Sequence, residues 1–227
     1  MKKKRKNKWD KARLEEMGEH ADALNPKVVV NGEPHLTMQP DRAKVHVDRY
    51  KFVNELSLKK SVIDCPCGFG YASKILDYTT YLGLDISETS IPYAIDRYGT
   101  KRVQFVNADA TKKLELEPVD TVISIEGIEH VFEPEKMIQN FHRWTNKQLI
   151  ISAPHNWGVN AEMKDGKRVG GGYHLWNSTA DSLIEMVEDA GFKVNGRYCI
   201  DNEAQIHSYA ALDTVHLPCV VLDCEKK

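Results

Sequence analysis

Four short apolar runs, each ending at or just before an acidic residue, constrain the fold of this chain more than any other feature. SVID ends at Asp64, TTYLGLD ends at Asp85, RVQFVN is soon followed by Asp109, and DTVISI is followed by Glu126. Such runs lack the polar alternation of half-exposed strands, and amphipathic segments separate them, which is typical of parallel strands covered on both faces. We therefore predict an α/β fold in which the four acids share the carboxyl edge of one sheet, where such sheets bind ligands.

The rest of the chain extends this alternation into a doubly wound, Rossmann-like, seven-stranded and mostly parallel sheet with helices on both faces. Helices are expected at 71–78, 87–98, 134–144 and 177–192. Strands are expected at 61–64, 79–85, 102–107, 120–125, 148–153, 192–200 and 217–223. Ser87 or Thr89 is a candidate N-cap for the second helix, and Asn177 or Ser178 for the last.

The first 60 residues contain three prolines and a glycine that break regular structure, so loops and one or two short helices are expected there. We predict a basic tail and N-terminal flank or lid over residues 1–45, and a single domain over residues 46–227.

The charge distribution and the cysteine content indicate which classes of partner and which cellular location to expect. Six of the first eight residues are Lys or Arg, so the net charge of −2 leaves −8 on the remainder. An acidic body argues against a broad nucleic-acid-binding face. No apolar run is long enough to cross a membrane. An odd count of five cysteines without a secretory signal predicts reduced thiols and a cytoplasmic location.

A nucleoside site is predicted where the first strand of the sheet turns into the next segment. Gly68 and Gly70 lie in that turn, and Asp85 follows Asp64 by 21 residues, at the end of the next strand. A carboxylate at that position can accept both hydroxyls of a ribose. Asp64 would repel a diphosphate but attract the ammonium group of a methionine tail. These residues favour S-adenosylmethionine over a dinucleotide.

Five segments, VIDCPCGFGYAS, YLGLDIS, VQFVNADA, VDTVISIEGIEHVFEP and LIISAPHN, together resemble the class I S-adenosylmethionine-dependent methyltransferases. The resemblance is strongest to the ubiquinone-biosynthesis O-methyltransferase branch and covers about residues 46 to 195. One departure is Pro66, which stands where the family pattern has glycine. Because proline fixes φ and lacks an N–H, the turn is expected to tighten differently.

The resemblance implies a set of cofactor-binding residues: Asp64, Gly68, Gly70, Asp85, Ile86, Asp109, Ala110 and Glu126. Asp64 and the glycine turn would hold the methionine part. Asp85 would bind the ribose, and Ile86 would flank the adenine. Asp109 would accept from the adenine amino group beside the backbone N–H of Ala110. Glu126 would lie below the methionine tail or face the acceptor.

The segment after the fourth of these strands carries candidate catalytic chemistry. If it opens a helical turn, Glu126, Glu129 and His130 share one face. Because histidine titrates near neutral pH, His130, with Glu129, is a candidate general base. Alternatively, Glu126, Glu129, His130 and the later His174 hold Mg²⁺ or another divalent cation that lowers the pKa of acceptor oxygens. A third interpretation is that Glu129 and His130 only cap and orient the turn.

The arrangement also resembles that of the metal-using small-RNA 2′-O-methyltransferases. The sequence therefore predicts an S-adenosylmethionine-dependent methyltransferase acting on an oxygen of a small hydroxylated molecule or a sugar. The alternatives are a metal-assisted RNA 2′-O-methyltransferase, against which the acidic body argues, and a non-catalytic nucleoside-binding scaffold, for which Pro66 is the only support. Base-amine methylation is disfavoured because EGIE stands where such enzymes carry a DPPY-type motif.

Overall fold

The computed structural model describes residues 24–30, 33–36, 40–158, 162–164, 167–169, 174–201, 203–216 and 218–227. Its strands span Leu24–Val30 (β1), Glu33–Leu36 (β2), Ser61–Asp64 (β3), Thr80–Asp85 (β4), Val103–Asn107 (β5), Val119–Ile125 (β6), Thr145–Pro154 (β7), Glu162–Lys164 (β8), Lys167–Val169 (β9), Phe192–Ile200 (β10), Ile206–His207 (β11) and Cys219–Lys226 (β12). The main sheet has eight strands in the order β11-β10-β12-β7-β6-β3-β4-β5. The pairs β1–β2 and β8–β9 form separate hairpins.

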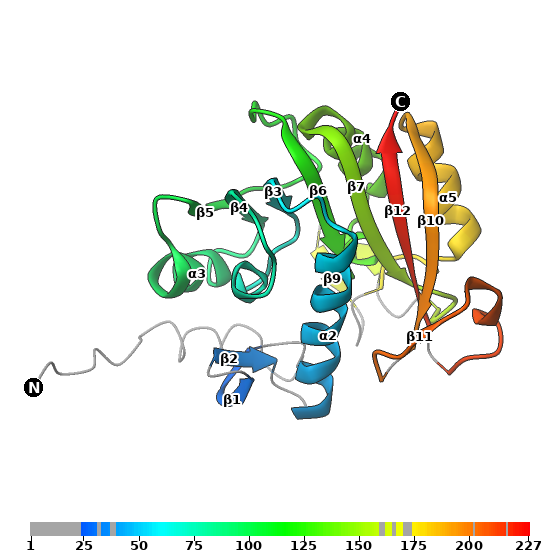
Figure 1. Ribbon diagram of the computed structural model, residues 1–227, viewed down its shortest axis with the longest axis horizontal. Helices are drawn as coiled ribbons and strands as arrows, with labels where there is room; N and C mark the ends of the chain where they lie inside the picture. The colour runs from blue at the N-terminus through cyan, green and yellow to red at the C-terminus, as the bar shows by residue number, and fades with distance from the viewer. Residues whose placement is uncertain are drawn as a thin grey trace, which may run out of the picture.

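Strand direction confirms the predicted doubly wound topology. Strands β5, β4, β3, β6 and β7 run parallel, whereas β12 is antiparallel to both β7 and β10. The arrowheads of β6 and β12 accordingly point to opposite edges of the sheet in Figure 1. The chain winds outward from β3 to β5 and returns to β6 on the other side of β3. The switch point, where doubly wound sheets bind ligands, therefore lies at the carboxyl ends of β3 and β6.

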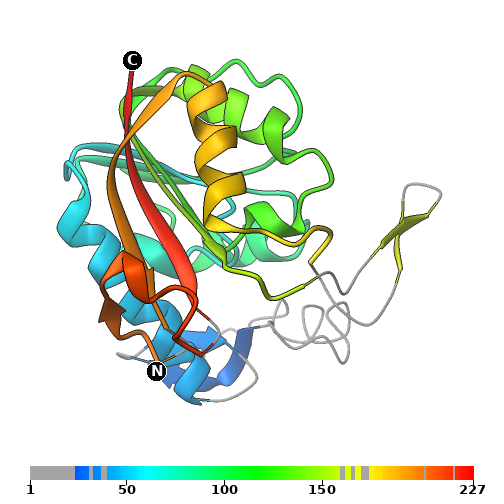
Figure 2. The same ribbon diagram turned by 90° about the vertical axis from the view of Figure 1, so that its right-hand side faces the viewer.

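Helices cover both faces of this sheet (Figure 2). On one side lie α2 (Pro40–Leu56), the 3₁₀ helix η1 (Tyr71–Lys74) and α3 (Ser90–Tyr98), and on the other lie α4 (Pro134–Trp144) and α5 (Ala180–Asp189). Successive residues of a strand pack on opposite faces of the sheet. Val62 packs in the core with side chains of α2 and α3, and Ile63 packs in the core with those of α4 and α5. Burial of apolar residues on both faces explains the continuous apolar runs in the sequence.

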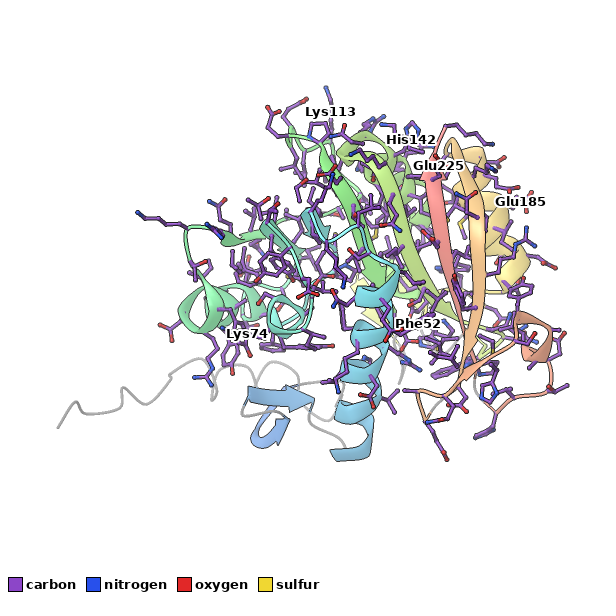
Figure 3. The ribbon with its side chains drawn as sticks, in the orientation of Figure 1. Phe52, Lys74, Lys113, His142, Glu185 and Glu225 are labelled. Carbon is purple, nitrogen blue, oxygen red and sulfur yellow. The ribbon has the colours of Figure 1, made fainter. Side chains whose placement is uncertain are left out.

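The N-terminal flank differs from the expectation of loops and short helices. It contains the β1–β2 hairpin and α2, a helix of 17 residues that crosses the predicted boundary at residues 45 and 46. Pro40, read from the sequence as a breaker, is the first residue of α2, a position that tolerates proline because the first-turn N–H groups have no helical partner. Figure 3 shows Phe52 of α2 beside the sheet, where its ring meets that of Tyr198 on β10 at 5.1 Å between centroids.

Two local predictions were wrong, one strand of the main sheet was missed, and the hairpins β1–β2 and β8–β9 were not predicted. Residues 71–78 form only the four-residue η1, because the chain turns back early to start β4. The N-cap of α5 is Thr179, whose hydroxyl accepts from the backbone N–H of Ser182 at 3.1 Å in a capping box. All seven predicted strands are present, and the eighth, β11, is a two-residue edge strand. Across the described residues, no helix is long and apolar enough to cross a membrane.

Candidate active site

The turn after β3 leaves room for a ligand at one glycine and is tightly packed at the other. At Gly70, with φ of 78°, an added Cβ would lie 2.5 Å from Cε1 of Phe105, so only glycine fits there. Gly68, with φ of 52°, has no heavy atom within 4 Å of the place an added Cβ would take. The backbone of Gly68 therefore faces open space, as a surface that receives a ligand must.

Asp85, at the end of β4, is bonded to this turn. Its Oδ2 accepts the backbone N–H of Gly68 at 2.8 Å, and its Oδ1 accepts that of Ser87 at 2.9 Å. Burial raises the pKa of Asp85, and the N–H groups of Ser87, Gly68 and Ile86 act in the opposite direction. The neighbouring Ile86 is 67% exposed, which sets an apolar surface beside a carboxylate. This pairing suits a nucleoside, which presents a ribose and a flat base.

Asp64 lies beneath the turn and is fully buried. Its Oδ1 accepts the hydroxyl of Tyr50 at 3.1 Å, and its Oδ2 accepts that of Tyr81 at 2.6 Å. Burial raises the pKa of Asp64 to about 7, although both hydroxyls act to lower it. The contacts of Asp64 are thus with α2 and β4, and the direct cofactor contact inferred from the sequence stays a prediction.

Asp109 and Ala110 follow β5 at the same edge. Oδ1 of Asp109 accepts hydrogen bonds from the N–H and the hydroxyl of Thr111, at 2.9 and 2.7 Å, so this carboxylate stabilises the turn in which it lies. The carbonyl of Ala110 accepts from Asn140 on α4 at 2.7 Å. The N–H of Ala108 donates to the carbonyl of Asp85 at 2.9 Å and holds the ends of β4 and β5 together. The predicted adenine side of the site is therefore adjacent to the predicted ribose side.

Glu126, directly after β6, forms a buried polar group with two residues absent from the predicted set. Its carboxylate pairs with Arg49 of α2 and accepts from the thiol of Cys219 on β12. Nη2 of Arg49 also donates to Sγ of Cys219, at 3.3 Å. Burial acts to raise the pKa of Glu126, but Arg49, His46, the bond from Cys219 and His130 together lower it. Glu126 therefore carries a negative charge at the switch point.

The backbone of Glu126 explains why it departs from the predicted shared face. Its φ is 50°, so the chain does not continue as a helical turn from Glu126 to His130. The helical turn begins later, as the 3₁₀ helix η2 (Ile128–His130). The helix α2 also carries Arg42, Lys44 and Lys51, so no pattern in the sequence distinguishes Arg49 from them. Nothing in the sequence points to Cys219 either.

Glu129, His130 and His174 gather in one place. The carboxylate of Glu129, which is 1% exposed, lies 3.5 Å from Nε2 of His130, and the rings of His130 and His174 are 5.3 Å apart. One ligand atom from each lies within 4.8 Å of the others, a spacing that can hold a metal ion. Three of the four predicted metal ligands thus meet, and Glu126 is not part of this group.

Two contacts fix the segment that brings His174 to η2. The N–H of Leu175 donates to the carbonyl of Glu129 at 2.9 Å, and Nε1 of Trp176 donates to the carbonyl of Ile128 at 3.0 Å. The ring of Trp157, after β7, lies 6.0 Å from that of His174. The glycine run at 170–172 and Tyr173 lie outside the described residues.

Comparisons with known proteins agree with this fold. Residues 63–151 match a family model described as a methyltransferase domain. The fold is similar to that of an S-adenosylmethionine-dependent methyltransferase from Clostridium acetobutylicum, with a TM-score of 0.59 and 10% identity over 82% of this chain and 91% of the other. It is also similar to magnesium protoporphyrin IX methyltransferase from Synechocystis with bound S-adenosylmethionine, with a TM-score of 0.56 and 17% identity over 82% of this chain and 82% of the other. A third similar structure is the [4+2]-cyclase SpnF, with a TM-score of 0.60 and 17% identity over 79% of this chain and 81% of the other. A search of curated protein sequences gives no match.

Proposed function

This chain carries a class I S-adenosylmethionine-dependent methyltransferase domain, and we propose that it methylates an oxygen of a small hydroxylated molecule or a sugar. The observation that carries the oxygen specificity is the Glu129–His130–His174 group. A hydroxyl is a weak nucleophile until it loses its proton, and this group supplies either a base or a cation for that step. Glu129 and His130 follow β6, which lies next in the sheet to β3, and the turn after β3 holds Gly68.

The residues present fit S-adenosylmethionine. Gly68 presents backbone to open space, and Arg49 carries a buried Nε for which no hydrogen-bond acceptor is found among the described residues. Asp85 would accept the ribose hydroxyls, Ile86 would cover the adenine, and Asp109 would face its amino group. When bound, the cofactor supplies a methyl group made electrophilic by a positively charged sulfur. The protein then needs to orient the acceptor and remove its proton.

Two observations support a role for His130 in removing that proton. It is partly exposed, so an acceptor can reach it, and it lies beside the buried carboxylate of Glu129. A carboxylate beside an imidazole orients the ring and stabilises the imidazolium formed when the base takes a proton. In this version of the proposal Glu129 positions His130, and His130 is the general base.

A divalent cation, Mg²⁺ or another, is the second candidate for the same step, favoured by the 4.8 Å spacing of the three ligand atoms. Glu129, His130 and His174 would hold it, and it would lower the pKa of a bound acceptor hydroxyl.

An RNA acceptor is a weaker alternative because the chain beyond the basic tail is acidic. The five cysteines are free and buried, which supports the proposed cytoplasmic location.

Binding and product analysis test the proposal. We expect titration calorimetry of the full chain to detect binding of both S-adenosylmethionine and S-adenosylhomocysteine. Incubation with S-adenosylmethionine and a panel containing catechol, a phenol, a monosaccharide and a short RNA should yield a methyl ether of a small acceptor by mass spectrometry. Failure to bind either nucleoside would overturn the proposal, and binding without any turnover would support the scaffold alternative.

A further inference from the structure

A cavity of about 270 Å³ lies at the edge of the main sheet opposite to the cofactor turn. It is bounded by the end of η1, the loop before β4, the end of α3 and the start of β5. The parallel strands β4 and β5 begin at this edge and end at the other one, at Asp85 and Asn107. The cavity is therefore separate from the proposed cofactor site, and the proposed reaction does not use it.

Two basic side chains border the cavity. Lys74 ends η1 on the α3 side of the sheet (Figure 3), and Arg102 directly precedes β5. Both are exposed, and neither forms an ion pair with another described residue. The carboxylate closest to Lys74 in the sequence, that of Asp77, pairs instead with Lys59 at 3.3 Å and accepts from Asn54 at 3.1 Å. The border of the cavity thus carries two positive charges, which favours an anionic ligand.

The end of α3 opposes an anion only weakly. The carboxyl end of a helix carries about half a negative charge, and α3 ends at Tyr98, which lines the cavity. One of its last carbonyls, that of Ile95, already accepts the N–H of Gly99 at 3.0 Å. The two full positive charges of the basic side chains exceed this partial charge.

Thr100 adds a hydroxyl that is set to donate. Its Oγ1 accepts the backbone N–H of Arg102 at 3.2 Å and that of Val103 at 3.1 Å. A hydroxyl has two lone pairs and one proton, so both lone pairs are used and the O–H bond is directed away from these two N–H groups. An anionic oxygen is the acceptor with which such a donor forms its strongest hydrogen bond.

Two tyrosine rings give the cavity fixed walls. The hydroxyl of Tyr78 donates to the carbonyl of Ser73 at 2.6 Å, and its ring lies 5.3 Å from that of Tyr81. The ring of Tyr98, which is buried, lies 6.5 Å from that of Tyr93. Small-molecule sites begin at about 300 Å³, so the volume suits a small organic anion better than a bare ion. The rings can pack against the carbon skeleton of such a ligand.

We propose that this cavity binds a phosphate monoester of a small polar molecule, with the phosphate on Lys74, Arg102 and Thr100 and the carbon skeleton against Tyr78 and Tyr98. A phosphate is favoured over a carboxylate because it offers three oxygens to three separate donors and carries nearly two negative charges. The proposal goes beyond the methyl transfer and does not depend on it. It gives the chain a second small-molecule site, at the amino edge of the parallel strands.

Calorimetry of the full chain in a phosphate-free buffer tests the proposal, with glucose 6-phosphate as the probe and glucose as its uncharged match. We expect glucose 6-phosphate to bind, and glucose to bind more weakly by about tenfold or more. Lys74→Ser/Arg102→Ser should weaken binding of glucose 6-phosphate by about tenfold or more, and should unfold near the temperature of the unaltered chain because both side chains are exposed. Lys112→Ser/Lys193→Ser removes two exposed charges elsewhere and is the matched control, with unchanged affinity.

Competition with S-adenosylhomocysteine separates this site from the cofactor site. Saturating S-adenosylhomocysteine should leave the affinity for glucose 6-phosphate unchanged within about twofold, because the two sites lie at opposite edges of the sheet. Displacement of the probe would assign it to the cofactor site and overturn the proposal. Equal affinity in the Lys74/Arg102 variant would assign the binding to another basic segment, such as the tail, and would also overturn it. So would the absence of binding at about 10 mM probe, a concentration that detects even millimolar affinity.

Discussion

The backbone N–H of Gly68 donates to Oδ2 of Asp85 at 2.8 Å, and this bond joins the turn after β3 to the end of β4. The second oxygen of Asp85 accepts from Ser87. A carboxylate oxygen has two acceptor sites, so each oxygen can still accept a ribose hydroxyl. One side chain therefore sets the shape of the turn and offers the ribose its acceptors.

Asp85→Ala should weaken S-adenosylmethionine binding strongly. The change removes the ribose acceptors and the anchor of Gly68 together, and we expect at least a tenfold loss, or about 1.4 kcal/mol. Titration calorimetry measures this loss of affinity, and thermal unfolding confirms that the variant is folded. Asp96→Ala, at an exposed position on α3, is the control and should bind like the unaltered chain. Equal affinity of the Asp85 variant would reject the site.

Alanine at the two turn glycines should separate cofactor binding from stability. Gly70→Ala places a methyl group 2.5 Å from Phe105 and 2.8 Å from Ala94, so we expect a stability loss of about 2 to 4 kcal/mol from overpacking and backbone strain. Gly68→Ala meets no atom within 4 Å and should cost only about 1 kcal/mol of strain, yet its methyl group projects into the proposed cofactor space.

Urea unfolding and calorimetry on both glycine variants make that comparison. The Gly68 variant should remain folded and lose most of its affinity for S-adenosylhomocysteine. If it instead binds as well as the unaltered chain, the open space at Gly68 is not part of the cofactor site.

Seven strands of the main sheet and the edge that carries the acids could be predicted because burial on both faces leaves a continuous apolar signal in each strand. Asp64, Asp85 and Glu126 close their strands as expected. The partners of these acids could not be predicted, because they come from distant parts of the chain. Tyr50 reaches Asp64 from α2, and Cys219 reaches Glu126 from the last strand.

The predicted face shared by Glu126, Glu129 and His130 shows why spacing alone misplaces a side chain. The rule that residues three and four apart are neighbours holds only inside a helix. The positive φ of Glu126 and the short η2 rotate Glu126 toward Arg49 and leave Glu129 beside His130. His174, 44 residues after His130, was placed by resemblance, and backbone bonds of its neighbour Leu175 hold it there.

Asp64 should make stability depend on pH. An aspartate in an unfolded chain ionises near pH 4, whereas Asp64 in the fold keeps its proton up to about pH 7. Between these values the folded state binds more protons, so stability falls as pH rises, by up to about 1.4 kcal/mol per unit, and no further above pH 7. Asp64→Asn cannot titrate and should lack this contribution.

Urea unfolding of the unaltered chain and of the Asp64→Asn variant from about pH 5 to about pH 8 isolates the contribution of Asp64 to stability. The contributions of the other titrating groups cancel in the difference between the two free energies of unfolding. The stability advantage of the unaltered chain over the Asn variant should shrink steadily over the lower part of that range and level off near neutrality. A difference that does not change with pH would show that Asp64 does not hold its proton in the fold.

Removal of divalent cations should distinguish the two proposed roles of the Glu129–His130–His174 group. If a cation is held there, chelator abolishes turnover, added Mg²⁺ or Mn²⁺ restores it, and His174→Ala weakens Mn²⁺ binding at least tenfold by calorimetry, because one of three ligands is lost. His207→Ala, at the distant strand β11 where His207 pairs with Asp201, is the matched control and should bind Mn²⁺ normally.

Full turnover in chelator would contradict the cation and leave His130 as the base. In that case His130→Ala should lower kcat by about 10²- to 10⁴-fold, while His174→Ala has a smaller effect. Glu129→Gln should lower kcat without changing S-adenosylhomocysteine affinity, because it weakens only the orientation of His130. Normal kcat in all three variants would exclude both roles and leave the group as a support for η2.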